Sequence, residues 1–414
     1  MSRNRSLVLL VFGIFFIISF MTNVIGVIIP DLITGLSLSL TLAGLFPFSF
    51  FIAYALLSIP AGFLVERYGE KRVLLFSYLL QVVGALGFAL FPTLEVALPG
   101  VFLIGAGMAV IQVAVNPLLR VAGGEEHFAF NAVLAQIMFG VSSFLSAHVY
   151  TELVAHPGFF SAVTPPGQPY VSLYWVFALL AVMMFALVSM LRFPRVDKTE
   201  GEKAGAWTTY GELLRSKTVL LFFVGIFAYV GTEQGITDWM SKFLSTYYGY
   251  DPQTVGASAV GWFWGLMTLG CLAGLVLLKL FDSRYVLVGA VLLAMAILSV
   301  ALFGPAEAAL WAFPACGIAA SVMWSIVFSL ALNSVERHHG SFAGILCTGI
   351  AGGALVPLLI GWLGDLVGLR LALCFLYLTL AYLFFIALWA KPLIPNATRR
   401  STARQKSEAA GGRT

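Results

Sequence analysis

Two carboxylates lie inside an otherwise apolar stretch, and they are the residues best suited to chemistry in this sequence. Glu233 lies near the middle of the apolar segment 218–246, and Asp238 follows five residues later. A charged Asp at the centre of a membrane helix costs ~2.5–3.5 kcal/mol on insertion scales, so such a group usually faces a partner or an ion pathway. The alternative role is a structural carboxyl that pairs with a neighbouring helix. We expect Glu233 to mark an ion or substrate pathway, with Asp238 as the second candidate.

The composition predicts that these acids lie in an integral membrane protein. Of the 414 residues, 60% are hydrophobic and 10% are charged, whereas soluble domains carry about 25% charged residues. Apolar segments of membrane-spanning length recur along the chain. We expect twelve spans, at about 7–29, 41–64, 73–92, 97–118, 128–154, 172–191, 218–246, 254–278, 285–303, 308–331, 341–363 and 370–390.

The basic residues predict the orientation of these spans. If the N-terminus is cytoplasmic, every Lys and Arg except Lys242 and Arg370 falls on the cytoplasmic side. Cytoplasmic loops of membrane proteins are enriched in these residues. We therefore expect a multi-pass protein of a bacterial-type inner membrane, with both termini in the cytoplasm.

The longest polar stretch divides the spans into six and six. We expect a first half at 1–192, a cytoplasmic linker at 193–217 with a short surface helix near 210–215, and a second half at 218–395. The remaining residues, 396–414, predict a disordered basic tail. The expected fold is an all-α membrane protein whose two six-helix halves surround a central cavity.

The apolar segments also carry amide and indole side chains that suit a sugar. Amides both donate and accept hydrogen bonds, and aromatic faces pack against the C–H surface of a sugar ring. Each amide has the alternative role of joining two helices, which is worth ~0.6 kcal/mol on average in membranes. We expect a monosaccharide or a polyol-like solute to contact a set of these residues, namely Asn23, Gln112, Gln136, Gln234, Trp262 and Trp324.

A polar loop follows the second apolar segment and reads GFLVERYGEKR over 62–72. Gly62 and Gly69 permit close helix approach and a tight turn, and Glu66, Arg67 and Arg72 offer charges to helix ends. This loop resembles the loop between the second and third helices of the major facilitator superfamily. The resemblance implies that these five residues act in gating rather than in binding substrate.

Three further stretches resemble one family of that superfamily, the fucose–galactose–glucose:proton symporters. They are AVNP at 114–117, YVGTEQG at 229–235 with Trp239, and IVFSLAL at 326–332 followed by GGALVP at 352–357. The resemblance extends from Asn23 to about Gly368 and implies ion-coupled sugar transport. It also adds Asn116 to the residues expected to bind the sugar.

The same resemblance fails at two positions where fucose-transporting members carry acids for proton coupling and sugar binding. Those positions fall on Gly26 and Gln112 in this chain. Glu233 stands where fucose-transporting members carry glutamine, and sodium-linked glucose carriers look similar there. The resemblance therefore leaves Glu233 as the expected coupling group.

Several mechanisms stay open at this point. Proton symport, sodium symport with sodium bound at Glu233, and uncoupled sugar uniport are all compatible with these residues. An exporter of amphipathic compounds and a non-transporting membrane sensor are further alternatives. The sequence lacks a P-loop and a nucleotide-binding pattern, so we do not expect ATP-driven transport. We expect a monomeric transporter rather than an enzyme, with no cofactor, no metal other than a possible sodium ion, and no nucleic-acid partner.

Overall fold

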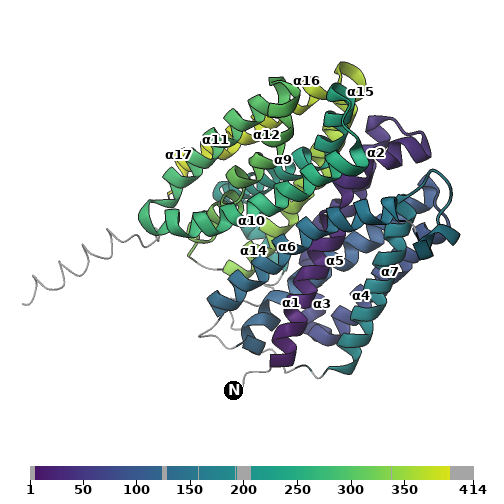
Figure 1. The fold of residues 1–414 in the computed structure, drawn as a ribbon. Coiled ribbons are helices and arrows are strands. Elements are labelled where there is room, and N and C mark those ends of the chain that lie inside the picture. Colours follow the sequence, from purple (N-terminus) through teal and green to yellow (C-terminus); the bar gives the residue numbers. More distant parts are fainter. Residues whose placement is uncertain are drawn as a thin grey trace, which may run out of the picture.

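The computed structural model consists of helices and the turns between them (Figure 1). It describes residues 5–123, 128–156, 158–191, 193, 207–336 and 338–391. Twelve helical segments are long and apolar enough to cross a membrane. This finding confirms the all-α membrane fold and the twelve expected spans. The tail 396–414 and most of the linker 193–217 lie outside the described residues, so the domain boundaries stay predictions.

Six of the spans come from the first half of the chain. The first span consists of two helices that meet at a break next to Asn23, and each of the other five is one helix. The helices of this half are α1 (Arg5–Thr22), α2 (Ile25–Leu36), α3 (Leu40–Tyr68), α4 (Glu70–Leu90), α5 (Leu94–Gly123), α6 (Phe128–Ala155) and α7 (Tyr170–Met190), and η2 (Gly158–Ala162) lies in the loop before α7.

The other six spans come from the second half, where three spans are interrupted. At the break in the tenth span, the Ser321 hydroxyl donates to the Ile318 carbonyl oxygen at 2.7 Å, a local bond that competes with regular helix. The helices are α9 (Lys217–Tyr248), η4 (Pro252–Gly256), α10 (Ala257–Leu280), α11 (Ser283–Phe303), α12 (Ala306–Ala320), α13 (Met323–Leu332), α14 (His339–Thr348), η5 (Gly349–Ala351), α15 (Gly352–Val367), α16 (Leu369–Leu373) and α17 (Leu376–Trp389).

The two halves pack against each other mainly along four helix pairs of the described chain. These pairs are α2 with α9, α3 with α14, α3 with α15, and α6 with α10, and Figure 1 shows the purple-to-blue and green-to-yellow halves as two groups of helices. Gly26 permits the first contact, because a Cβ there would lie 2.1 Å from the carbonyl oxygen of Thr237. We call the end of the bundle where α1 begins and α13 ends the proximal end, and the end where α2 ends and α3 begins the distal end.

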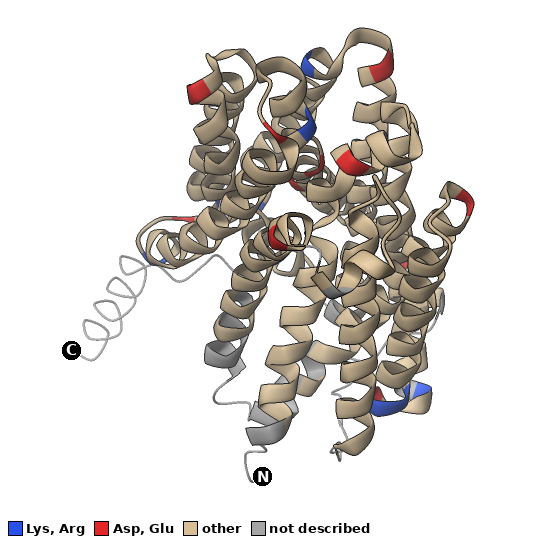
Figure 2. Cartoon of the chain, turned by 45° about the vertical axis from the view of Figure 1, so that its right-hand side comes forward, with Lys and Arg blue, Asp and Glu red and all other residues tan. Residues whose placement is uncertain are grey.

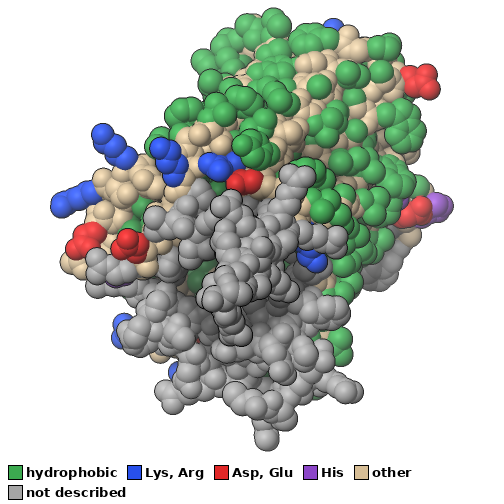
Figure 3. Space-filling model, turned by 90° about the vertical axis from the view of Figure 1, so that its left-hand side faces the viewer, with side chains coloured by type: hydrophobic (Ala, Val, Ile, Leu, Met, Phe, Trp, Pro, Cys, Tyr) green, Lys and Arg blue, Asp and Glu red, His purple; other side chains and the backbone are tan. Residues whose placement is uncertain are grey.

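The surface is that of a membrane protein. Large hydrophobic side chains are exposed along the helices, among them Leu9, Met190 and Leu388, each more than 60% exposed, and Figure 3 shows such side chains over much of the described surface. Charged residues lie mostly near helix ends (Figure 2). The apolar shafts match the hydrocarbon layer and the charged ends match its two interfaces.

A short helix, α8 (Trp207–Leu214), lies within the linker at the proximal end. The sequence predicts a surface helix here, but the Tyr210 side chain is only 5% exposed. Its ring centroid lies 6.1 Å from that of Phe63 in the first half, and its hydroxyl would lie 3.5 Å from a Cβ at Gly344 in the second half. The linker helix therefore contacts both halves.

Candidate functional site

Helix α9 positions Glu233 near its midpoint, in the interior of the bundle. Both carboxylate oxygens of this partly buried residue accept hydrogen bonds. The Tyr229 hydroxyl, one helical turn earlier, donates to Oε2, and Gln234 Nε2 donates to Oε1 at 3.2 Å. No ion pair involves Glu233 among the described residues. A carboxyl held by neutral donors can exchange a proton or hold a cation without first breaking a salt bridge.

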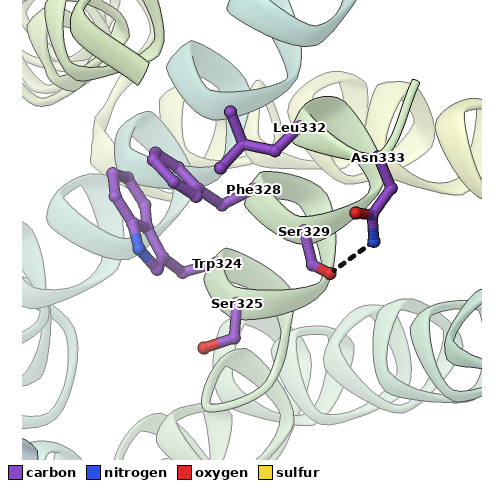
Figure 4. A pocket seen from close by; sticks show the side chains of 6 residues that line it. All are labelled: Trp324, Ser325, Phe328, Ser329, Leu332 and Asn333. Atoms are coloured by element: carbon purple, nitrogen blue, oxygen red, sulfur yellow. Dashed lines mark hydrogen bonds between the residues drawn. The ribbon is translucent and has the colours of Figure 1, made fainter. Parts of the chain in front are cut away.

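A pocket of about 390 Å³ lies along α13. Figure 4 shows an apolar stripe of Trp324, Phe328 and Leu332, and a polar stripe of Ser325, Ser329 and Asn333. These stripes arise because residues four apart share one face of a helix. The Trp324 and Phe328 rings stack with centroids 5.7 Å apart, and Asn333 Nδ2 donates to Ser329 Oγ at 3.3 Å. Aromatic faces beside hydroxyl and amide groups suit a small polar ligand with C–H faces.

Tyr229 links the carboxylate to this pocket. Its hydroxyl binds Glu233, and its ring centroid lies 5.9 Å from that of Trp324. A change at Glu233 can therefore reach the aromatic wall of the pocket through one side chain. Sequence reasoning missed Tyr229, although its position four residues before Glu233 puts both on one face of α9.

Two of the predicted sugar-binding residues belong to this region. Trp324 lines the pocket. Gln234 is buried beside Glu233, and a Cβ at Gly353 would lie 3.1 Å from its Cγ and 3.0 Å from the ring of Phe51 in the first half. Gln234 therefore lies where the two halves approach each other.

The remaining predicted sugar-binding residues lie elsewhere or have side chains outside the described set. Asn23 is buried and donates to Ser143 Oγ at 2.8 Å and to Ser19 Oγ at 3.3 Å, all within the first half. Trp262 is 43% exposed and packs edge-on against Phe144. Gln112 is partly exposed on α5, and the side chains of Asn116 and Gln136 fall outside the described residues. Their roles stay predictions.

Asp238, the second coupling candidate, lies one and a half turns beyond Glu233 on α9. It is 1% exposed, and its Oδ2 atom has no hydrogen-bond partner among the described residues. A Cβ at Gly26 would lie 2.8 Å from the Asp238 Cα. Asp238 is therefore enclosed at the contact between α2 and α9.

The predicted gating loop connects α3 and α4 at the proximal end. Gly69 makes the turn with φ = +80°, a backbone conformation that glycine adopts without a steric penalty. The Arg67 guanidinium lies 5.4 Å from the centroid of the neighbouring Tyr68 ring. Gly62 is partly buried within α3 and Arg72 is exposed, while the Glu66 side chain lies outside the described residues.

Two carboxylates that sequence reasoning missed join the halves at the distal end. Asp31 on α2 accepts hydrogen bonds from the Tyr150 hydroxyl and, at 2.8 Å, from Gln253 Nε2 of the second half. Asp365 on α15 accepts from the backbone N–H groups of Leu40 and Thr41, the start of α3, at 2.9 and 2.7 Å. Each carboxylate therefore fastens one half to the other.

No cluster of three or more His, Cys, Asp or Glu side chains that could hold a metal ion occurs among the described residues. The four cysteines are free thiols inside helices or their turns. The chemistry available at the site therefore rests on Glu233, its neutral donors and the α13 pocket.

Known proteins similar to this chain include sugar transporters. A glucose/galactose transporter of Brucella abortus is 29% identical over 388 residues, which cover 91% of this chain and 92% of the relative. An L-fucose-proton symporter of Escherichia coli is 24% identical over 418 residues, which cover 90% and 92%. The solved structure of an E. coli fucose:proton symporter matches the fold with a TM-score of 0.67 at 20% identity, covering 94% of this chain and all of that one.

A match to a family model identifies the family. The sequence profile of the Major Facilitator Superfamily matches residues 11–350, which include the gating loop, Glu233 and the α13 pocket. With its twelve spans in two halves, this chain belongs to the Major Facilitator Superfamily.

Proposed function

We propose that this protein is a secondary active transporter that moves a monosaccharide or a similar small polar solute by alternating access, coupled to an ion. The observation that carries the proposal is the contact chain from Glu233 through Tyr229 to Trp324, which joins a titratable carboxyl to an aromatic and hydroxyl-lined pocket. The names of the relatives, glucose/galactose transporter and L-fucose-proton symporter, support a sugar as the solute.

Glu233 is the coupling carboxyl in this proposal. Coupling requires a group whose ion occupancy differs between the loaded and the empty transporter. Binding a proton removes the charge of Glu233 and so weakens or redirects the hydrogen bond from Tyr229. Because the Tyr229 ring contacts Trp324, this change can alter the aromatic wall of the pocket. The name of the fucose relative favours a proton over sodium. Sodium bound by carboxylate and amide oxygens at Glu233 is the second candidate.

The proposal extends to location and assembly. The protein lies in a bacterial-type inner membrane as a monomer with cytoplasmic termini, so the proximal end faces the cytoplasm. The distribution of Lys and Arg supports this orientation. The gating role of Gly62, Glu66, Arg67, Gly69 and Arg72 belongs to the same proposal, because these residues flank the turn between α3 and α4 at the proximal end.

Counterflow in proteoliposomes tests the substrate class. Vesicles preloaded with one unlabelled monosaccharide at a time are diluted into the same labelled sugar, with and without sodium and at several pH values. We expect transient accumulation for at least one hexose or 6-deoxyhexose, unaffected by sodium. Flux of lipophilic cations and none of any sugar would favour the amphipathic exporter instead.

A variant in the α13 pocket tests, in the same assay, whether this pocket binds the sugar. Trp324→Ala removes the ring that stacks on Phe328 and contacts Tyr229, and such aromatic contacts are worth ~0.5–1.5 kcal/mol beyond area burial. We expect the half-saturating sugar concentration to rise by about tenfold or less. Trp311→Ala, at an exposed position on α12, is the matched control and should leave it unchanged.

A further inference from the structure

A carboxyl outside the proposed coupling site is buried between the two halves. Asp31 lies near the middle of α2 and is 8% exposed. Tyr150 on α6 donates to one oxygen, and Gln253 in η4 donates to the other at 2.8 Å. Thr151, next to Tyr150, donates through Oγ1 to the Gln253 carbonyl oxygen at 3.1 Å. Asp31 is thus enclosed by groups from both halves, and separation of the distal ends would remove Gln253 from it.

The charged and titratable groups around Asp31 supply no positive charge. Tyr150 of α6, Tyr170 of α7 and Asp251 before η4 interact with it electrostatically. Asp238 on α9 lies deeper, beside Gly26. No Lys, Arg or His forms an ion pair with Asp31 in the described part of the chain.

These surroundings fit a neutral carboxylic acid. A buried carboxylate without a cation is costly, whereas the neutral acid is far cheaper to bury. The same partners also suit the protonated form. Oδ1 still accepts from Gln253 Nε2, and the bond in which Tyr150 donates to Oδ2 can reverse when Oδ2 carries the proton, since a phenol both donates and accepts.

We propose that Asp31 is a second proton-linked carboxyl, which takes up one proton from water on the distal side when the distal end closes and returns it there on reopening. In this cycle Glu233 carries the coupled ion, and Asp31 determines when the distal end can close. The inference rests on the alternating access of the proposed function. It does not depend on which solute is moved, so it can be tested without substrate.

Distance measurements between spin labels test this directly. The labels are attached at His156→Cys in the first half and Glu307→Cys in the second, both at exposed distal positions, after replacement of the four native cysteines. Electron spin resonance in sugar-free proteoliposomes then reports the fraction of molecules with short and long distances. We expect the short-distance, distally closed fraction to rise as the pH is lowered from mildly alkaline to mildly acidic values.

Substitutions show whether Asp31 causes that pH response. Asp31→Asn, which mimics the neutral acid, should remain closed at every pH, and Asp31→Glu, which keeps a titratable group, should restore the response. Gln253→Leu should lower the closed fraction at all pH values while the response persists. Glu233→Gln should keep a pH response, because Asp31 is intact.

Three results would overturn the inference. These are a wild-type pH response in Asp31→Asn, loss of the response in Glu233→Gln, or a Gln253→Leu variant identical to the wild type. Failure of sugar counterflow alone, with the label response intact, would reject the proposed substrate and not the role of Asp31.

Discussion

The distal and proximal ends of the bundle are held in different ways. At the distal end, Asp31 and Asp365 each accept hydrogen bonds from the opposite half. At the proximal end, α3 packs directly against α14 of the second half and the ring of the linker residue Tyr210 packs on Phe63, while no ion pair between the halves occurs among the described residues. The α13 pocket extends to Asn333 at the proximal end. The difference indicates a state that is closed distally and whose pocket lies toward the proximal side.

The strongest way to break the distal closure is to push α2 away from α9. Gly26→Val puts a side chain where a Cβ would lie 2.1 Å from the Thr237 carbonyl oxygen. Overpacking of this kind costs ~1–3 kcal/mol, so the closed population should fall by roughly five- to 150-fold, and transport should be lost. Spin-label distances and counterflow measure both effects. Gly13→Val is the control, since no atom lies within 4 Å of a Cβ there; equal loss in both variants would contradict the account.

A smaller effect is expected from removing one contact between the halves. Asp365→Asn keeps the side-chain size but weakens the bonds to the start of α3, where capping groups contribute ~1 kcal/mol. The closed population should fall by about fivefold. Asp282→Asn makes the same change at a cap that lies within one half, where Asp282 Oδ1 accepts from the Arg284 N–H at 2.9 Å. If Asp282→Asn opens the distal end as much as Asp365→Asn, the bond between halves is not what matters.

The smallest effect on the distal closure is expected at the proximal loop. Arg67 is exposed and its nearest ring, Tyr68, belongs to the same half, and exposed contacts of this kind are worth ~0.5–1 kcal/mol. Arg67→Ala should slow net transport by a few-fold at most, while sugar affinity in equilibrium binding stays within about twofold. A large loss of affinity with normal exchange would contradict the gating role.

The apolar runs predict the number of spans because backbone N–H and C=O groups inside lipid must be hydrogen-bonded, and a continuous apolar helix satisfies this along its whole length. They do not predict where a helix ends. The apolar segments end at about 29 and 363, whereas the spans continue to Leu36 and Val367. Asp31 and Asp365 lie in those extensions. Each carboxylate accepts hydrogen bonds from the opposite half, and these donors are not visible in the sequence of one segment. Sequence reasoning missed them for that reason.

The candidate site was predictable only in part. Glu233 stands out in the sequence as an acid within an apolar segment, and the predicted ligand Gln234 donates to it at 3.2 Å. Asn23 has the same chemistry as a sugar ligand, but its amide donates to Ser19 and Ser143. The type of an amide side chain does not reveal whether its partner is a ligand or another helix, since both satisfy the same donors and acceptors.

The central claim is that Glu233 couples the pocket to an ion, and one variant tests it most directly. Proteoliposomes containing Glu233→Gln are assayed for counterflow and for sugar accumulation driven by an imposed ion gradient. Glutamine keeps an acceptor for Tyr229 but cannot ionise. We predict that counterflow persists while gradient-driven accumulation is abolished. Accumulation equal to that of the wild type would contradict the account.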